Sequence, residues 1–284
     1  MNADDFGLTS GVNRAILELH KAGVLTSTTL MAKAAATEEA LALALANPSL
    51  GVGCHVVLVD GEPALPPETI PTLVDKKTGR FPSALTTFLK RLYTGRIRSE
   101  EITAEAAAQI ALLQSSGLRL THIDTHKHTH MFPAVLRPIL RAAHAAGIRA
   151  VRNPFEPEWA VRATPRASWI RTAEVFALRQ FGPFFRRLLA QHGFETTDGT
   201  IAVAGTGVLD ANMVRSLLSK LPDGTWELVT HPGYNDADLD KIHTRLRASR
   251  DIERNALQAI TEFPAIELTS FAGLLPTPPA ATII

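Results

Sequence analysis

The sequence predicts an α/β fold built as a single (β/α) TIM-like barrel, either complete or distorted and incomplete, with its active site at the carboxyl-terminal rim of the strands. The chain has 284 residues, of which 45% are hydrophobic, and one barrel of this class takes about 250 residues. Strand and helix patterns alternate along it, which favours a parallel sheet with crossover helices. Polar residues suited to catalysis follow several of the strand patterns, where such a barrel carries its site.

Short apolar runs bounded by turn residues predict the strands. They lie near residues 24–31, 51–58, 120–126, 148–152, 200–204, 226–231 and 265–270. Apolar residues at helical spacing predict helices near residues 10–22, 36–46, 99–116, 134–146, 209–220 and 243–262. Gly23, Gly117 and Gly147 stand where helix C-caps belong. These elements form one domain, and the proline-rich residues 273–284 are expected to be a loose tail.

Residues 121–130 contain four of the ten histidines of the chain. The even positions of this segment carry His122, Asp124, His126, His128 and His130. In an extended strand these side chains would all point to one side. Imidazole suits zinc and related divalent metals, and a carboxylate two residues away can bind the metal or orient a histidine. The alternative is a polar strand end whose histidines bond to the backbone.

Asp4 and Asp5 form an adjacent pair of carboxylates near the start of the chain. On an extended segment they point apart, so one can bind a metal while the other faces a water or an arginine. Surface turns also carry such pairs. His55 lies in the apolar run 51–59, where a buried histidine needs a polar partner. Asp5, His55 and His126 would together complete the ligand set of an open catalytic metal site.

Four motifs, in this order, resemble the YdjC-like carbohydrate deacetylases. They are Ala3–Gly7, Gly53–His55, Thr121–His128 and Thr230–Gly233. The resemblance covers residues 1–272, which defines the barrel domain. Within the family the chain is most similar to the hopanoid-biosynthesis deacetylase (HpnK) branch, through His55–Gly61 with Leu65–Pro67 and through Val151–Pro157.

The resemblance implies a metal-dependent N-deacetylase, a hydrolase of linear amide C–N bonds. Its substrate would be an N-acetylglucosamine unit on a glycosylated hopanoid lipid, and its product acetate. Other branches act on chitooligosaccharides of the diacetylchitobiose type, which is the alternative substrate. The resemblance further implies that Asp5, His55 and His126 hold one divalent metal. Zinc is favoured by ligand type, with magnesium and nickel as alternatives.

The resemblance also implies roles around this metal. Asp4 would be the general base, Arg152 would fix Asp4, and His231 would protonate the departing amine. Asp124, His128 and His130 would orient ligands or contact the sugar.

The chain departs from related proteins in two ways. Polysaccharide deacetylases carry both metal histidines in one short motif, whereas His55 and His126 are expected on two strands. Family members also begin with a full apolar strand, but only Met1, Asn2 and Ala3 precede the aspartates, which leaves open whether a first strand forms.

Net charge and cysteine content bear on the partners and the cellular compartment of the protein. A formal charge of +1 gives no support for a nucleic-acid partner. The only cysteine, Cys54, excludes an internal disulfide and fits a reducing cytoplasm; we expect it to be buried and inert. The sequence shows neither a signal sequence nor the roughly 20 apolar residues of a membrane span. The prediction is therefore a cytoplasmic protein, soluble or peripheral to the membrane.

Residues 160–190 form a basic, aromatic segment, with six arginines against Glu174 alone, a balance of +5. Such a segment can lie on an anionic membrane surface or hold a lipid tail. The alternative is packing on the barrel or on the second subunit of a homodimer.

Two other functions compete with deacetylation. A glycosidase needs two carboxylates that flank the glycosidic bond, which Asp4 and Asp5 fit poorly as neighbours. A non-catalytic metal-binding protein would use the histidine run without turnover.

Overall fold

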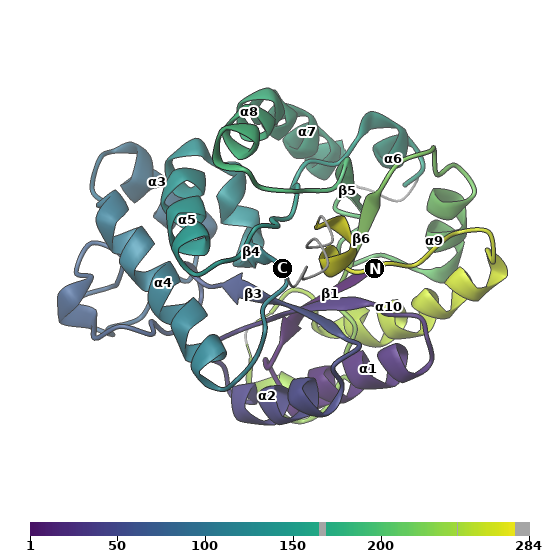
Figure 1. Ribbon diagram of the computed structural model, residues 1–284, viewed down its shortest axis with the longest axis horizontal. Helices are drawn as coiled ribbons and strands as arrows, with labels where there is room; N and C mark the ends of the chain where they lie inside the picture. The colour runs from purple at the N-terminus through teal and green to yellow at the C-terminus, as the bar shows by residue number, and fades with distance from the viewer. Residues whose placement is uncertain (165–168, 243, 276–284) are drawn as a thin grey trace, which may run out of the picture.

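The computed structural model describes residues 1–164, 169–242 and 244–275. Six parallel strands form one curled sheet in the order β4-β3-β2-β1-β6-β5, with helices around its outside (Figure 1). The strands are β1 (Asn2–Phe6), β2 (Ser27–Leu30), β3 (Gly51–Val56), β4 (Ile123–Thr125), β5 (Gly199–Ile201) and β6 (Trp226–Thr230). The α/β prediction is confirmed, and the sheet forms a half-barrel.

Ten α-helices occur in the described residues. They are α1 (Ser10–Lys21), α2 (Thr37–Ala46), α3 (Leu85–Tyr93), α4 (Ser99–Ser115), α5 (Pro133–Ala145), α6 (Glu158–Arg162), α7 (Trp169–Leu178), α8 (Gly182–His192), α9 (Ala211–Leu218) and α10 (Arg250–Ala256). Short 3₁₀ turns are η1 (Pro67–Thr69), η2 (His126–Met131), η3 (Arg179–Phe181), η4 (Leu239–Lys241), η5 (Arg247–Ser249), η6 (Leu257–Glu262) and η7 (Phe271–Leu274). Sequence patterns did not predict α3 or α6, and for α7 and α8 they indicated only an amphipathic segment at residues 160–190, with a helix packed on the barrel as one alternative.

The first strand forms, although only Met1 precedes it. Asn2 pairs with Ser27 of β2 on one side and with Val229 of β6 on the other. All five residues of β1 are buried. Both aspartates therefore stand on a strand that has neighbours on each side, which settles the question that the short N-terminal segment raised.

The gap between β4 and β5 is bridged by residues 149–155, which form isolated bridges rather than the predicted strand 148–152. The Ile123 amide donates to the Ala150 carbonyl at 3.0 Å, and the Val151 amide donates to the Glu195 carbonyl at 3.0 Å. Farther along, the Thr200 amide donates to the Phe155 carbonyl at 3.3 Å. The described residues thus give six strands rather than the eight of a complete TIM barrel, as the distorted form of the prediction expects.

Three other predicted elements differ. The strand predicted at 120–126 spans only Ile123–Thr125, because η2 follows with Lys127 and His128 in left-handed backbone conformations, at φ 55° and 51°. No strand forms at 265–270, where the Thr269 carbonyl instead accepts a bond from Thr26 Oγ1. The helix predicted at 243–262 begins at Arg250 and ends in η6. Residue 243 lies outside the described residues.

Gly23, Gly117 and Gly147 each have positive φ after a helix, as their predicted capping positions require. Of the predicted tail, residues 276–284 also lie outside the described range. None of the helices in the described ranges is long and apolar enough to cross a membrane.

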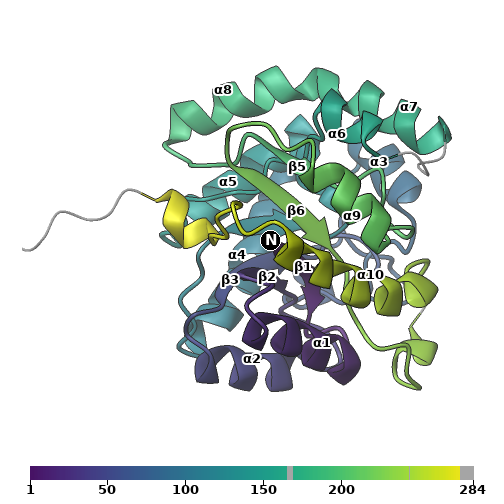
Figure 2. The ribbon, with the colours of Figure 1, turned by 90° about the vertical axis from the view of Figure 1, so that its right-hand side faces the viewer.

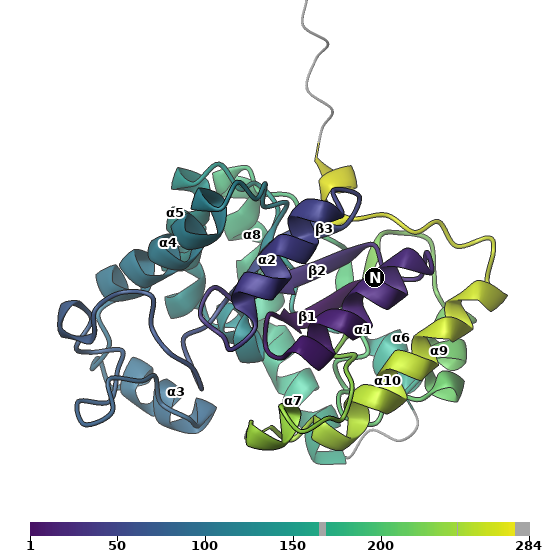
Figure 3. The same cartoon turned by 90° about the horizontal axis from the view of Figure 1, so that it is seen from below.

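The segment α7 lies at the carboxyl-terminal rim. Its Val175 is buried with Val161, Val203 and Val229. Val203 follows the end of β5, and Val229 lies near the end of β6. α7 and α8 cover the same side of the molecule (Figure 2), and α7 and η7 lie at opposite ends of it (Figure 3). Trp169, Ile170 and Phe176 of α7 face solvent, with exposed fractions of 79%, 53% and 42%.

Candidate metal and catalytic site

The carboxyl ends of four strands bring the predicted site residues together. Asp4 and Asp5 lie on β1, His55 on β3 and Asp124 on β4, while His126 and His231 directly follow β4 and β6. Because parallel strands end at one rim, side chains far apart in the sequence meet there. His55 and His126 do stand at two different strands, as expected.

The two adjacent aspartates differ in backbone conformation and in their partners. Asp5 has a φ of 67°, a left-handed conformation that Asp tolerates better than most residues. Asp4 contacts Arg152, and Asp5 contacts Arg250. Burial alone would raise the pKa of each carboxyl, but the charges of the arginines and of the nearby histidines together outweigh it and hold both pKa values well below the usual range. Both groups are therefore ionised at neutral pH.

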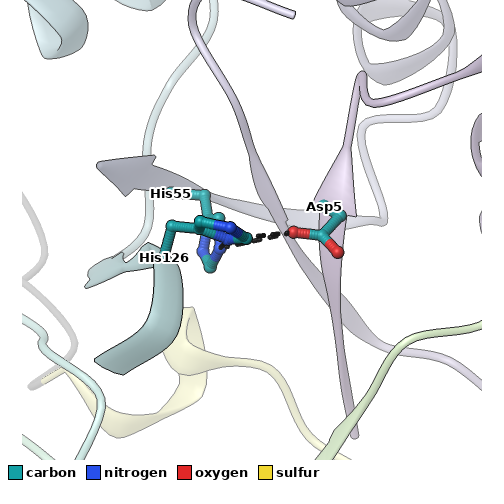
Figure 4. Close-up of side chains that lie close together, drawn as sticks. All are labelled: Asp5, His55 and His126. Atoms are coloured by element: carbon teal, nitrogen blue, oxygen red, sulfur yellow. Dashed lines mark hydrogen bonds and ion pairs between the residues drawn. The ribbon is translucent and has the colours of Figure 1, made fainter. Parts of the chain in front are cut away.

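Asp5, His55 and His126 form a compact group of potential metal ligands (Figure 4). Asp5 Oδ1 lies 3.6 Å from His55 Nε2 and 3.4 Å from His126 Nδ1, and the two nitrogens are 3.2 Å apart. A tetrahedral ion with bonds of about 2.1 Å separates its ligand atoms by about 3.4 Å. The three donor atoms thus fit a zinc-like ion, and one carboxylate with two imidazoles leaves a position for water.

Asp124 orients His55. Its Oδ1 lies 2.7 Å from His55 Nδ1. Burial lowers the pKa of His55, but the charge and hydrogen bond of Asp124 and the charges of Asp4 and Asp5 together outweigh it and raise this pKa to about 9. His55 would bind a metal as the neutral imidazole, with the proton of Nε2 displaced. The proton on Nδ1 would stay with Asp124, which is the usual carboxylate–histidine arrangement at metals.

A second cluster that could hold an ion, Asp4, His55 and Asp124, fits less well. Arg152 already neutralises both of its carboxylates.

Arg152 is fully buried and directly follows Ala150 and Val151, which form the isolated bridges. Its Nη1 and Nη2 donate to the two oxygens of Asp4, at 2.8 and 2.6 Å. It also pairs with Asp124, and its Nε donates to Glu227 Oε1 at 2.8 Å. The two parallel hydrogen bonds fix the carboxylate plane of Asp4. The family resemblance implies a contact between the same two residues.

His231 stands between two acids. Its Nε2 is 3.8 Å from Asp4 Oδ2, and its Nδ1 is 3.7 Å from Glu253 Oε2. Glu253 Oε2 also accepts the backbone N–H of His231 at 2.7 Å. Burial would lower the pKa of His231, but the bond and charge of Glu253 outweigh it and raise the pKa. A protonated imidazole can therefore persist beside Asp4.

The other histidines of the run lie apart from the ligand group, because the strand ends at Thr125. His130 bonds to Thr125 Oγ1 and to the Arg152 carbonyl, so it supports the backbone; burial lowers its pKa to about 4. His122 stacks on Phe271 with ring centroids 3.9 Å apart. Burial lowers the pKa of His128 well below its usual range. The expectation that all five even positions share one face is wrong.

Sequence reasoning missed four contributors. Arg250 and Glu253 come from α10, Glu227 from β6, and Thr29 from β2, where its Oγ1 lies 3.1 Å from His55 Nδ1. Glu227 is a charged residue inside an apolar strand, and this pattern could have indicated that it pairs with a buried charge. Arg250 had no comparable signal, because an arginine within the predicted helix 243–262 does not indicate a partner 245 residues away. Cys54 is buried, and burial raises the pKa of its thiol, as expected of an inert cysteine.

Comparison with known proteins gives consistent matches. A family model described as YdjC-like protein matches residues 1–263. The chain is 31% identical to a carbohydrate deacetylase of Thermoanaerobacter pseudethanolicus over 258 residues, which is 90% of this chain and 89% of that protein. It is 35% identical to a carbohydrate deacetylase of Geobacillus stearothermophilus, over 84% and 80% of the two chains.

A crystal structure from Enterococcus faecalis V583 has a similar fold, with a TM-score of 0.71 and 26% identity. The match covers 96% of this chain and 97% of that one, a protein with a proposed role in cellobiose-phosphate cleavage.

Proposed function

Because the chain belongs to the YdjC-like protein family, we propose that it is a carbohydrate N-deacetylase, a hydrolase that cleaves the acetamide C–N bond of an N-acetylated amino sugar. Relatives that match most of the chain carry the name carbohydrate deacetylase. The observation that carries the proposal is the juxtaposition of a ligand trio, an arginine-held Asp4 and an acid-paired His231 at one rim. These groups can supply a metal site, a general base and a general acid, which metal-assisted amide hydrolysis needs.

Asp5, His55 and His126 would hold one divalent metal, with zinc favoured by the donor types. When bound, such a metal polarises a carbonyl and lowers the pKa of its water. Magnesium and nickel remain alternatives, because carboxylate and imidazole also serve them.

Asp4 is the proposed base. It is ionised, and Arg152 holds it by both oxygens, so it can accept a proton only along a fixed direction. His231 is the proposed acid, because Glu253 and Asp4 favour its protonated form. An amide nitrogen leaves poorly until it gains a proton. Asp124 would orient His55, and His128 would border the sugar, while the buried His130 holds the backbone through Thr125 and the Arg152 carbonyl.

A lipid-linked substrate is the finer part of the proposal. Trp169, Ile170 and Phe176 are exposed on α7, whose Val175 packs at the rim that carries the site. An apolar carrier such as a hopanoid would find a surface there. Arg166 of the basic aromatic segment lies outside the described residues. Peripheral membrane contact and a homodimer are other uses of the same surface, and a chitooligosaccharide is the alternative substrate.

The test is to incubate zinc-loaded protein with N-acetylglucosaminyl hopanoid and, separately, with diacetylchitobiose. Acetate release and a product lighter by one acetyl group are expected. A glycosidase would release a sugar instead, and a non-catalytic metal-binding protein would bind zinc without product. Zinc-loaded, folded protein that releases acetate from neither substrate would contradict the proposal.

A further inference from the structure

Arg250 is a buried arginine whose only side-chain hydrogen bond or ion pair among the described residues is with Asp5. Its Nη2 donates to Asp5 Oδ2 at 2.5 Å, while its Nε and Nη1 have no hydrogen-bond partner there. The residue is 1% exposed. A buried donor without a partner costs about 1–3 kcal/mol. Two of its donor atoms therefore gain nothing from the fold, and the contact with Asp5 is what this side chain supplies.

The fold makes room for this side chain. A Cβ at Gly233 would lie 3.0 Å from Arg250 Cδ, so a glycine there leaves space for the arginine. A buried arginine with two unpaired donor atoms and a single carboxylate partner points to a role at that carboxylate.

The two oxygens of Asp5 have different surroundings. Oδ1 faces His55 Nε2 and His126 Nδ1, while Oδ2 is engaged by Arg250. A carboxylate held in this way offers a metal one oxygen. If Oδ2 were free, it could bind the same ion and fill the position that a catalytic site keeps open.

Resting on the proposed metal-dependent function, we propose that Arg250 is a positioning residue that keeps Asp5 a one-oxygen ligand. The guanidinium thereby preserves an open coordination position for water and substrate. Arg152 performs a separate task, since it holds Asp4. Each aspartate of the adjacent pair thus has its own arginine.

Cobalt(II) added to metal-free protein gives the test, because its visible absorption weakens as its coordination number rises. Arg250→Met should lower the absorbance per bound cobalt and lower kcat about 10–100-fold, the range found for groups that orient metal ligands. Arg250→Lys should restore much of the absorbance, because an ammonium group can also hold Oδ2. Arg254→Met is the matched control: this arginine lies on the same helix, pairs with Asp251 and should leave the spectrum unchanged.

Folded Arg250→Met protein with the wild-type cobalt spectrum would overturn the proposal. If Arg250→Met does not fold, Arg250→Gln tests the same contact, since its shorter, uncharged side chain cannot pair with Oδ2 as the guanidinium does and should weaken the absorption; an unaltered spectrum in that variant would be equally contrary. The spectrum is measured without substrate. If the protein failed to deacetylate its substrates, the proposed function would be contradicted. The cobalt spectrum would still show whether Arg250 controls the coordination of the metal.

Discussion

Asp4 and Asp5 are neighbours in the sequence but have different partners, so their substitutions should have different effects. Asp4→Asn removes the proposed base and leaves the three donor atoms of Asp5, His55 and His126 in place. We expect it to keep the metal and to lose about 10²–10⁴ in kcat. Metal analysis and acetate release measured on the same sample check this. If Asp4→Asn lost the metal while Asp5→Asn kept it, the two roles would have to be exchanged.

The histidine run gives a second prediction. His55→Ala and His126→Ala should each abolish metal binding, because an open three-ligand site does not tolerate the loss of a ligand. His130→Ala should retain the metal, since His130 bonds to Thr125 and the Arg152 carbonyl instead. Metal content of the purified variants is the measurement. Full occupancy in His126→Ala would refute the ligand assignment.

The buried histidines make stability depend on pH. Burial lowers the pKa of His122 to about 3 from an ordinary value of 6.5. The unfolded chain therefore takes up a proton at this residue below pH 6.5, whereas the folded protein does not until about pH 3. The contribution of His122 to stability is full above pH 6.5 and declines as the pH falls toward 3. Urea unfolding of metal-free protein at pH 6.5 and pH 4 should show this decline, and a folded His122→Asn variant should show less of it.

At the scale of elements, α7 decides between a lipid-linked and a soluble substrate. Trp169→Ser with Phe176→Ser removes two exposed aromatic side chains at the rim. Each large apolar side chain that a ligand fully buries contributes about 1.5–3 kcal/mol, so kcat/KM on the lipid-linked sugar should fall about 10²-fold or more. Turnover of diacetylchitobiose should stay nearly unchanged. Leu112→Ser is the control, because Leu112 of α4 is as exposed as Phe176. Equal losses on both substrates would show that α7 serves packing or a subunit contact.

Elements that depend on the sequence of one segment were predictable. Elements that depend on contacts between distant segments were not. The helices α1, α2, α4, α5 and α9 were predicted because apolar spacing and caps act within one segment. The left-handed residues after Thr125 are tied to a distant loop, since Lys127 Nζ binds Asp60 Oδ2 at 2.8 Å. No alternation within residues 121–130 carries that information.

The same distinction between local sequence and distant contacts applies to the candidate site. Asp5, His55 and His126 were recognisable because their residue types and motifs indicate metal chemistry. Arg250 contacts Asp5 from 245 residues away, so only the folded chain shows the pair. The place of Arg152 beside Asp4 was expected from family resemblance rather than from spacing.

At the scale of the whole molecule, metal binding should stabilise the fold, because the ligand trio joins β1, β3 and the end of β4. Zinc at 100 times its Kd should add about 2.7 kcal/mol to the free energy of unfolding. Denaturant titrations of chelator-treated protein, with and without zinc, measure the difference. His126→Ala should show little of it. An equal gain in that variant would mean that zinc binds elsewhere.

The position of β1 at the centre of the sheet has a consequence for biosynthesis. β1 pairs with β2 as soon as residue 30 has been made, but its other edge waits for β6, which begins at Trp226. At about 5–20 residues per second, the ribosome leaves that edge unpaired for roughly 10–40 s. An open strand edge invites pairing with other chains. The nascent protein should therefore depend on chaperones, and ribosomes stalled before Trp226 should carry chains that aggregate on release.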